Sequence, residues 1–186
     1  MNELQECHRL VWAFRKEIEP YWATPDPSNS LRYAFCEAAE AMDAWLRAER
    51  PNDSRNNERQ NDVLDELADC AIMLLTAVPE FKFECPVVDN PLDNSLSAFA
   101  LDNLIMDIGA LFFGFDSVCF SANVMIPLFR IASYPEMELK QRIQGRLARI
   151  AFKHMPLFKS AELIEKLQLP ANNLPYDSVN HPLVNE

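Results

Sequence analysis

Residues 31–47 read LRYAFCEAAEAMDAWLR, and residues 61–77 read NDVLDELADCAIMLLTA. In both stretches apolar residues recur every three to four positions, which is the spacing of a helix with one apolar face. Each stretch also carries two acidic residues three positions apart, Glu37 and Glu40 in the first and Glu66 and Asp69 in the second. A short polar segment that contains Pro51 separates them. The two stretches therefore predict antiparallel helices that pack on each other.

The acidic pairs occupy matching positions on these two helices. At about 100° per residue, Glu40 lies about 60° from Glu37, and Asp69 lies about 60° from Glu66 on the same side. The apolar residues fill an arc of about 60° to 180° on the other side of each helix. In the first helix they are Leu31, Ala34, Phe35, Ala38, Met42, Trp45 and Leu46, and in the second Val63, Leu64, Leu67, Ala71, Leu74, Leu75 and Val78. Packing by these stripes brings four carboxylates to face one another.

Four facing carboxylates repel one another unless a positive charge lies between them. A set of hard oxygen ligands without His or Cys suits Mg²⁺, with Mn²⁺ as a substitute, better than Zn²⁺. Glu37, Glu40, Glu66 and Asp69 are therefore candidate ligands of a divalent cation. The alternative is that both pairs are solvated surface charges; their matched positions on consecutive helices favour the metal.

Outside these stretches the chain also favours helix. We expect helices over residues 2–22, 29–50, 58–78, from 95 or 97 to about 109, 121–133 and 135–154, with a short one over 159–167. Residues 79–95 predict an irregular connection and residues 170–186 an irregular tail. The fold class is therefore all-α, a bundle of five or six helices. Residues 1–96 would hold the metal site, and residues 97–169 would complete the bundle or form a dimer interface.

The composition limits the function classes. The chain has 186 residues, enough for one ordinary domain, and a formal net charge of −11. Residues 1–96 hold 19 acidic and 9 basic residues, against 9 and 8 in residues 97–186. A chain this acidic is poorly suited to bind a nucleic-acid polymer or an anionic membrane. The concentrated carboxylates are consistent with a divalent cation and also with simple solubility.

Cysteine usage and the chain's first residues predict a cytoplasmic protein. The five cysteines form no C-x-x-C pair, and residues 1–9 are too polar for a signal peptide. We expect the cysteines to be reduced, with Cys36 and Cys70 as small core residues. The most apolar stretch, residues 99–120, is interrupted by three aspartates, which a membrane span tolerates poorly. With only three glycines, the chain lacks a Gly-rich phosphate loop.

Candidates for substrate binding are Trp12, Arg15, Arg146 and Lys153. Trp12 is either a stacking platform for a base or a core residue. Arg15 is either a phosphate ligand or an ordinary surface charge. The helix over 135–154 has one basic stripe, formed by Arg142, Arg146, Arg149 and Lys153. That stripe is either solvated or salt-bridged to the acidic half of the chain, or it reaches triphosphate oxygens through Arg146 or Lys153.

The run Glu37-Ala-Ala-Glu40, followed by Asp65-Glu66-Leu-Ala-Asp69, resembles the MazG-like, all-α nucleoside triphosphate pyrophosphohydrolase superfamily. Its pattern is E-x-x-E on one helix and E-x-x-D on the next, and the resemblance covers about residues 8–78. It implies Mg²⁺-dependent hydrolysis of a nucleoside triphosphate to a monophosphate and pyrophosphate, by a homodimer or higher homo-oligomer. It also implies that Glu37, Glu40, Glu66 and Asp69 hold the metal, with Glu40 a candidate for orienting the attacking water.

Two other functions are alternatives to hydrolysis. Di-iron carboxylate bundles use Glu-x-x-His motifs, whereas the third-position partners here are Glu40 and Asp69, which disfavours that class. A non-catalytic helical interaction module, with a vestigial acidic site and a partner surface after Val78, remains the alternative. Cys36 keeps it open, because many family members carry another Glu at that position. The sequence does not identify the nucleobase or the sugar.

Overall fold

The structure, a computed structural model, describes residues 3–49, 56–79, 96–113, 120–134 and 137–170. Within these ranges it has seven helices and no strand: α1 (Glu3–Ile18), α2 (Pro27–Ala48), α3 (Asn56–Thr76), α4 (Ala98–Leu111), α5 (Phe120–Ala132), α6 (Leu139–His154) and α7 (Leu157–Leu167). The all-α prediction is confirmed. The predicted irregular segments fall almost wholly on residues 80–95 and 171–186, which lie outside the described residues.

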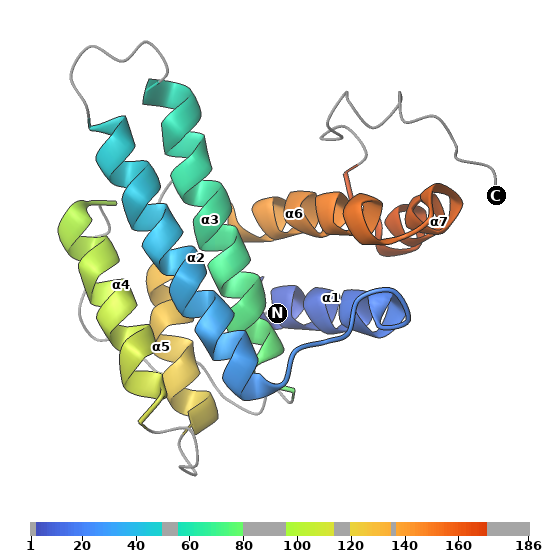
Figure 1. Ribbon diagram of the computed structural model, residues 1–186, viewed down its shortest axis with the longest axis horizontal. Helices are drawn as coiled ribbons and strands as arrows, with labels where there is room; N and C mark the ends of the chain where they lie inside the picture. Colours follow the sequence, from blue (N-terminus) through green and yellow to red (C-terminus); the bar gives the residue numbers. More distant parts are fainter. Residues whose placement is uncertain (1–2, 50–55, 80–95, 114–119, 135–136, 171–186) are drawn as a thin grey trace.

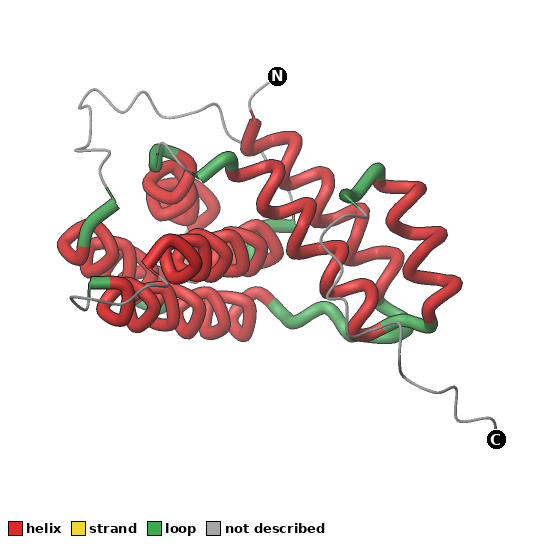
Figure 2. The backbone as a smooth tube through the Cα atoms, turned by 90° about the horizontal axis from the view of Figure 1, so that it is seen from above, coloured by secondary structure: helices red, strands yellow, loops and turns green. Residues whose placement is uncertain are grey.

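The helices form two groups that meet at α3. In the first group α2 and α3 lie side by side and antiparallel, and α4 and α5 pack against them (Figure 1). In the second group α1, α6 and α7 pack on one another, and α1 and α6 contact α3. From above, one group is seen nearly end-on and the other lengthwise, so their axes cross steeply (Figure 2). Helices after residue 97 thus contact both acidic helices, whereas the division of the chain at residue 96 stays a prediction.

Local sequence decides where α1 ends and α2 begins. α1 ends at Ile18, before the predicted residue 22, because Pro20 lacks the N–H that would continue the helical hydrogen bonds. α2 begins at Pro27, two residues before the predicted start. Its cap is Asp26, whose carboxylate accepts a hydrogen bond from the Asn29 backbone N–H at 2.8 Å. A proline is favoured in the first turn of a helix, so the start lies at Pro27 with Asp26 as the cap.

The later helices follow the predicted periodicity with small differences at their ends. α4 begins after Ser97, close to one of its two predicted starts, and the Ser97 hydroxyl accepts a hydrogen bond from the Ala100 backbone N–H at 3.2 Å. α5 matches the predicted helix over residues 121–133 to within one residue at each end, and it contains Pro127. α6 begins at Leu139 instead of residue 135, after Glu138 in a left-handed conformation with φ of 39°. The basic stripe nevertheless lies wholly within α6.

The buried face of α2 differs from the predicted one. Phe35 and Leu46 lie in the predicted apolar arc but are exposed, Leu46 with 53% of its surface accessible. The buried residues are mostly alanines on the ridge that carries Glu37: Ser30, Leu31, Ala34, Ala38, Ala41, Ala44 and Ala48. Small side chains let the two helix backbones approach closely, and α2 and α3 form the most extensive helix–helix contact. The buried face is therefore turned towards Glu37, which draws this carboxylate into the interface.

α3 is the central helix, and residues 63–78, which end two residues after it, are buried apart from the acidic edge. Cys7 and Cys70 are buried and belong to the hydrophobic core. Cys36 is exposed, so its predicted place in the core is wrong. It precedes Glu37 by one residue and so projects about 100° away from the interface. Among the described helices, none combines the length and apolarity needed to cross a membrane.

Candidate metal centre

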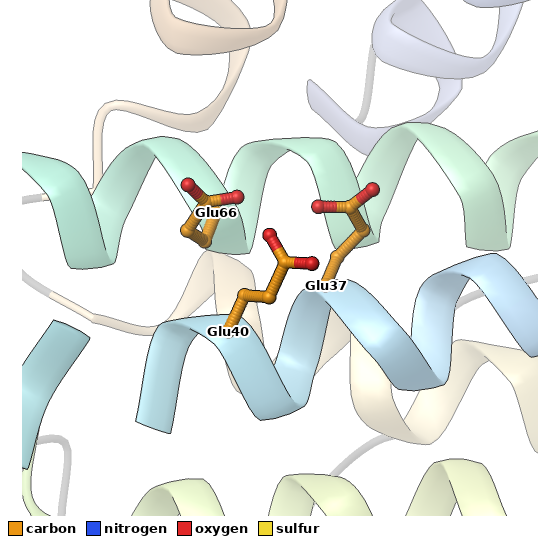
Figure 3. A group of neighbouring side chains, drawn as sticks. All are labelled: Glu37, Glu40 and Glu66. Atoms are coloured by element: carbon orange, nitrogen blue, oxygen red, sulfur yellow. The ribbon is translucent and has the colours of Figure 1, made fainter. Parts of the chain in front are cut away.

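Three carboxylates converge between α2 and α3. Glu37 and Glu40 come from α2 and Glu66 from α3, and each offers an oxygen within 4.8 Å of the others (Figure 3). Glu37 and Glu66 are half-buried, and Glu40 is exposed to solvent. The convergence follows from the helical spacing, because antiparallel packing on the alanine ridge places position 37 opposite the acidic edge of α3. We call this group the carboxylate cluster.

The electrostatics of the carboxylate cluster favour a cation. Burial raises the pKa of Glu37 to about 8, and the negative charges of Asp69, Glu40 and Glu66 act in the same direction. Burial also raises the pKa of Glu66, with further repulsion from Asp69, against the attraction of Arg146. These carboxyl groups therefore resist simultaneous ionisation. A divalent cation between them would remove that repulsion, and three carboxylates are ligands that Mg²⁺ and Mn²⁺ accept.

Asp69, the fourth predicted ligand, has a different partner in the structure. Both of its carboxylate oxygens accept hydrogen bonds from Arg146 of α6, Oδ1 from Nε at 2.8 Å and Oδ2 from Nη2. Burial raises the pKa of Asp69, and the hydrogen bonds and charge of Arg146 oppose that rise. The structure thus brings three of the four predicted ligands together and pairs the fourth with an arginine from a distant helix.

The acidic edge of α3 faces two neighbours. Glu66 faces α2, whereas Asp65 and Asp69 face α6. Asp65 accepts hydrogen bonds from Arg142 at 3.2 Å and from Arg149 at 3.0 Å. The salt-bridged form of the basic stripe is therefore present for its three arginines. Burial acts to lower the pKa of Arg146. The hydrogen bonds to Asp69 and the charges of Asp69 and Asp65 outweigh burial and raise this pKa above its ordinary value, so the guanidinium stays charged.

A cavity of about 650 Å³ lies beside the carboxylate cluster. Glu37 and Asp69 line it together with the basic residues Arg146, Arg149 and Lys153. Its aromatic lining residues are Tyr33, Trp22 and His154, of which the last two stack with ring centroids 4.6 Å apart and planes 6° apart. The cavity therefore joins acidic, basic and aromatic side chains from α2, α3 and α6 and from the segment that follows α1.

The predicted substrate-binding residues divide into two kinds. Arg146 and Lys153 line the cavity. Arg15 is 1% exposed and lies beneath the cavity wall, with its guanidinium 4.7 Å from the Trp22 ring centroid and its Nε donating to Thr76 at 3.3 Å. Burial lowers the pKa of Arg15 to about 10. The surface-charge alternative for Arg15 is therefore wrong.

Trp12 forms hydrogen bonds with the protein backbone. Its indole N–H donates to the backbone carbonyls of Leu75 and Val78, each at 3.1 Å. Leu75 lies in the last turn of α3, where carbonyls lack partners within the helix, and Val78 lies two residues after its end. Trp12 does not line the 650 Å³ cavity. Its position supports the core alternative over the stacking platform.

Replacing Trp12 by phenylalanine should therefore destabilise the protein without weakening substrate binding. The variant loses the indole N–H, and we expect a cost of about 1–2 kcal/mol, or roughly 2–6 °C in Tm. Thermal denaturation measures the stability, and calorimetric titration with a nucleoside triphosphate, the ligand class that the sequence resemblance implies, measures the binding. A weaker affinity at unchanged Tm would return Trp12 to the substrate site.

Sequence reasoning assigned no role to His154, although a signal for it exists. His154 lies eight residues after Arg146, so both project from the same side of α6, and both line the cavity.

Comparison of this chain with protein-family models, with curated proteins and with solved structures finds no match. Its function is therefore inferred from the chemistry of the site.

Proposed function

We propose that the protein is a Mg²⁺-dependent nucleoside triphosphate pyrophosphohydrolase, which cleaves between the α- and β-phosphates to give a monophosphate and pyrophosphate. The observation that carries the proposal is the convergence of Glu37, Glu40 and Glu66 beside a cavity with cationic and aromatic walls. The resemblance of α2 and α3 to the helix pair of the MazG-like superfamily supports the same reaction. Nucleotide-pool cleansing or control is the service that such a reaction performs.

The cavity suits a nucleotide in size and in polarity. Its volume of about 650 Å³ lies within the ~300–1,000 Å³ of small-molecule sites. From Arg146, beside Asp69, to His154, beside Trp22, α6 advances about 12 Å. The side of the cavity with Asp69 and Arg146 and the side with the stacked rings are thus separated along α6, and Lys153 adds a positive charge next to His154. This arrangement suits a polyphosphate near Arg146 and a base near the stacked rings.

The residues of the carboxylate cluster fit Mg²⁺, because they offer oxygen donors from two helices and their negative charges repel one another. When bound, Mg²⁺ supplies charge neutralisation at the phosphates and lowers the pKa of water. Glu37, Glu40 and Glu66 would hold it. Glu40, the exposed member, would also accept the proton of the attacking water as general base. Arg146 and Arg149 neutralise charge that develops on the leaving pyrophosphate.

Product analysis tests the proposal. Purified protein is incubated with a panel of ribo- and deoxynucleoside triphosphates, with Mg²⁺, with Mn²⁺ or with a chelator, and pyrophosphate is resolved from orthophosphate. We expect pyrophosphate and monophosphate in equal amounts, formed only with metal. Orthophosphate as the first product, or no turnover of any nucleotide with either metal, would overturn the proposal and favour the non-catalytic module.

The proposed assembly is a homodimer or a higher homo-oligomer. Large apolar side chains of α4 and the two residues after it are exposed: Phe99, Met106, Phe112 and Phe113, the last with 96% of its surface accessible. Exposed apolar side chains of this kind are typical of association surfaces. Light scattering coupled to size-exclusion chromatography measures the mass directly, and a monomer at micromolar concentration would contradict this part of the proposal.

A further inference from the structure

The three arginines of α6 converge on one carboxylate. Arg142, Arg146 and Arg149 are spaced four and three residues apart, so they project from one side of the helix. Their guanidinium nitrogens lie 3.2, 3.6 and 3.0 Å from the Asp65 carboxylate oxygens. We call these three residues the arginine row. Asp65 acts as the central anion of the row, and Asp69 accepts a second, two-pronged contact from Arg146.

These two aspartates leave the arginine row short of acceptors. Each guanidinium has five N–H donors and always carries a charge. Arg142 uses Nη1 on Asp65 and Nη2 on Asn61, and its Nε is buried with no hydrogen-bond partner among the described residues. Arg149 places Nη1 on Asp65, and its side chain is 42% exposed. Three positive charges therefore meet two negative ones, with a buried donor left over.

A second cavity, of about 370 Å³, opens at the arginine row. All three arginines line it, and its acidic lining residues are Asp65, already engaged, and Glu138. Arg146 and Arg149 line the larger cavity as well. The two cavities therefore share these two arginines as a common wall. Only these arginine side chains therefore separate a group bound in the second cavity from the larger cavity, which Glu37 lines.

We propose that the second cavity binds a pyrophosphoryl group, whose oxygens take over the donors of the arginine row from Asp65. Guanidinium groups bind phosphate oxygens through paired N–H donors, and a group with several oxygens can satisfy three of them at once. The pyrophosphoryl group is either the terminal pair of phosphates of a bound nucleotide or free pyrophosphate. This ligand identity rests on the proposed function, whereas the anion site rests on the arginine row alone.

Calorimetric titration with inorganic pyrophosphate in the presence of a chelator tests the site without metal or turnover. We expect the wild type to bind, and Arg142→Gln and Arg149→Gln each to bind about tenfold more weakly, or ~1.4 kcal/mol, since each loses a charge-assisted hydrogen bond to the ligand. Asp65→Asn should bind more tightly, because it removes the competing internal anion. Lys16→Gln, which removes the same charge from the exposed surface of α1, is the matched control and should bind like the wild type.

The Asp65→Asn variant distinguishes an arginine row that binds an anion from one that only holds α6 against α3. If the arginine row only joins α6 to α3, this variant lowers Tm and leaves pyrophosphate affinity unchanged or weaker, which overturns the proposal. Equal binding by the wild type and both arginine variants, or no binding at all, also overturns it. Pyrophosphate binding without any nucleotide turnover would retain the site while the proposed function fails.

A competition arm then identifies the source of the group. An α,β-methylene nucleoside triphosphate is titrated with Mg²⁺ into protein that holds pyrophosphate. Competitive displacement, with no displacement by the monophosphate, assigns the second cavity to the terminal phosphates of the nucleotide. Simultaneous binding of both ligands assigns it to free pyrophosphate. Either result supports the site and identifies the source of the group, whereas the pyrophosphate titrations of the wild type and the variants are the measurements that can overturn the site.

Discussion

Replacing Glu66 by glutamine is expected to remove nucleotide hydrolysis almost completely while making the metal-free protein more stable. The substitution keeps the size of the side chain and deletes one of the three carboxylates that converge within 4.8 Å. Loss of a charged group at the reacting centre costs about 10²-fold or more in kcat. The same change removes part of the repulsion that raises the pKa of Glu37. Tm should therefore rise by about 2–6 °C.

The opposite signs of the two effects make this test specific. Activity is measured as pyrophosphate release with Mg²⁺, and Tm by calorimetry with a chelator. Asp43→Asn is the matched control, since Asp43 lies one turn after Glu40 on α2, is 69% exposed and pairs with Arg47. It should change neither quantity appreciably. Full activity in Glu66→Gln, or a lower Tm in the chelated protein, would show that the carboxylate cluster is not a strained metal site.

Raising the pH from 6 to 9 is expected to destabilise the metal-free protein through Glu37. An ordinary glutamate ionises near pH 4.5, whereas the pKa of Glu37 in the folded protein is about 8. Between these values the folded protein keeps a proton that the unfolded chain has lost. This stabilisation is complete below pH 4.5 and is lost as the pH rises through 8. Tm should therefore fall across this range by several degrees.

Two comparisons attribute the pH effect to the carboxylate cluster. Glu37→Gln cannot ionise, so its Tm should fall less than that of the wild type between pH 6 and 9, while other titrating groups affect both proteins alike. Mg²⁺ should raise the Tm of the wild type most at pH 9, where the cluster is most negative. Parallel Tm profiles for the wild type and Glu37→Gln would contradict the pKa shift.

Much of the fold and three of the four predicted ligands could be predicted because they depend on short-range spacing. The helical periods of α2 and α3, and the convergence of Glu37, Glu40 and Glu66, follow from residues within two neighbouring helices. The partner of Asp69 could not be predicted in this way. Arg146 lies 77 residues further along the chain, and only the packing of α6 on α3 brings the two together.

The errors at other positions have the same origin. The periodicity of α2 placed Phe35 in the core, whereas α3 packs on the alanines and leaves it 36% exposed. Arg15 looks like a surface cation in sequence, yet the turn after α1 folds Trp22 back over its guanidinium. Such outcomes depend on which face a distant helix covers. Apolar spacing shows that a face exists but not which neighbour selects it.

The alanine ridge of α2 also bears on the choice of cation. Glu37 and Glu66 stand on different helices, so the gap between them is fixed by the side chains that hold the helix axes apart. Ala38 and Ala41, both fully buried, are such spacers. Mg²⁺ binds oxygen at ~2.0–2.1 Å and Ca²⁺ at ~2.3–2.6 Å, so the width of the gap discriminates between ions. In the proposed enzyme, selectivity for a small ion would thus reside in methyl groups that never touch it.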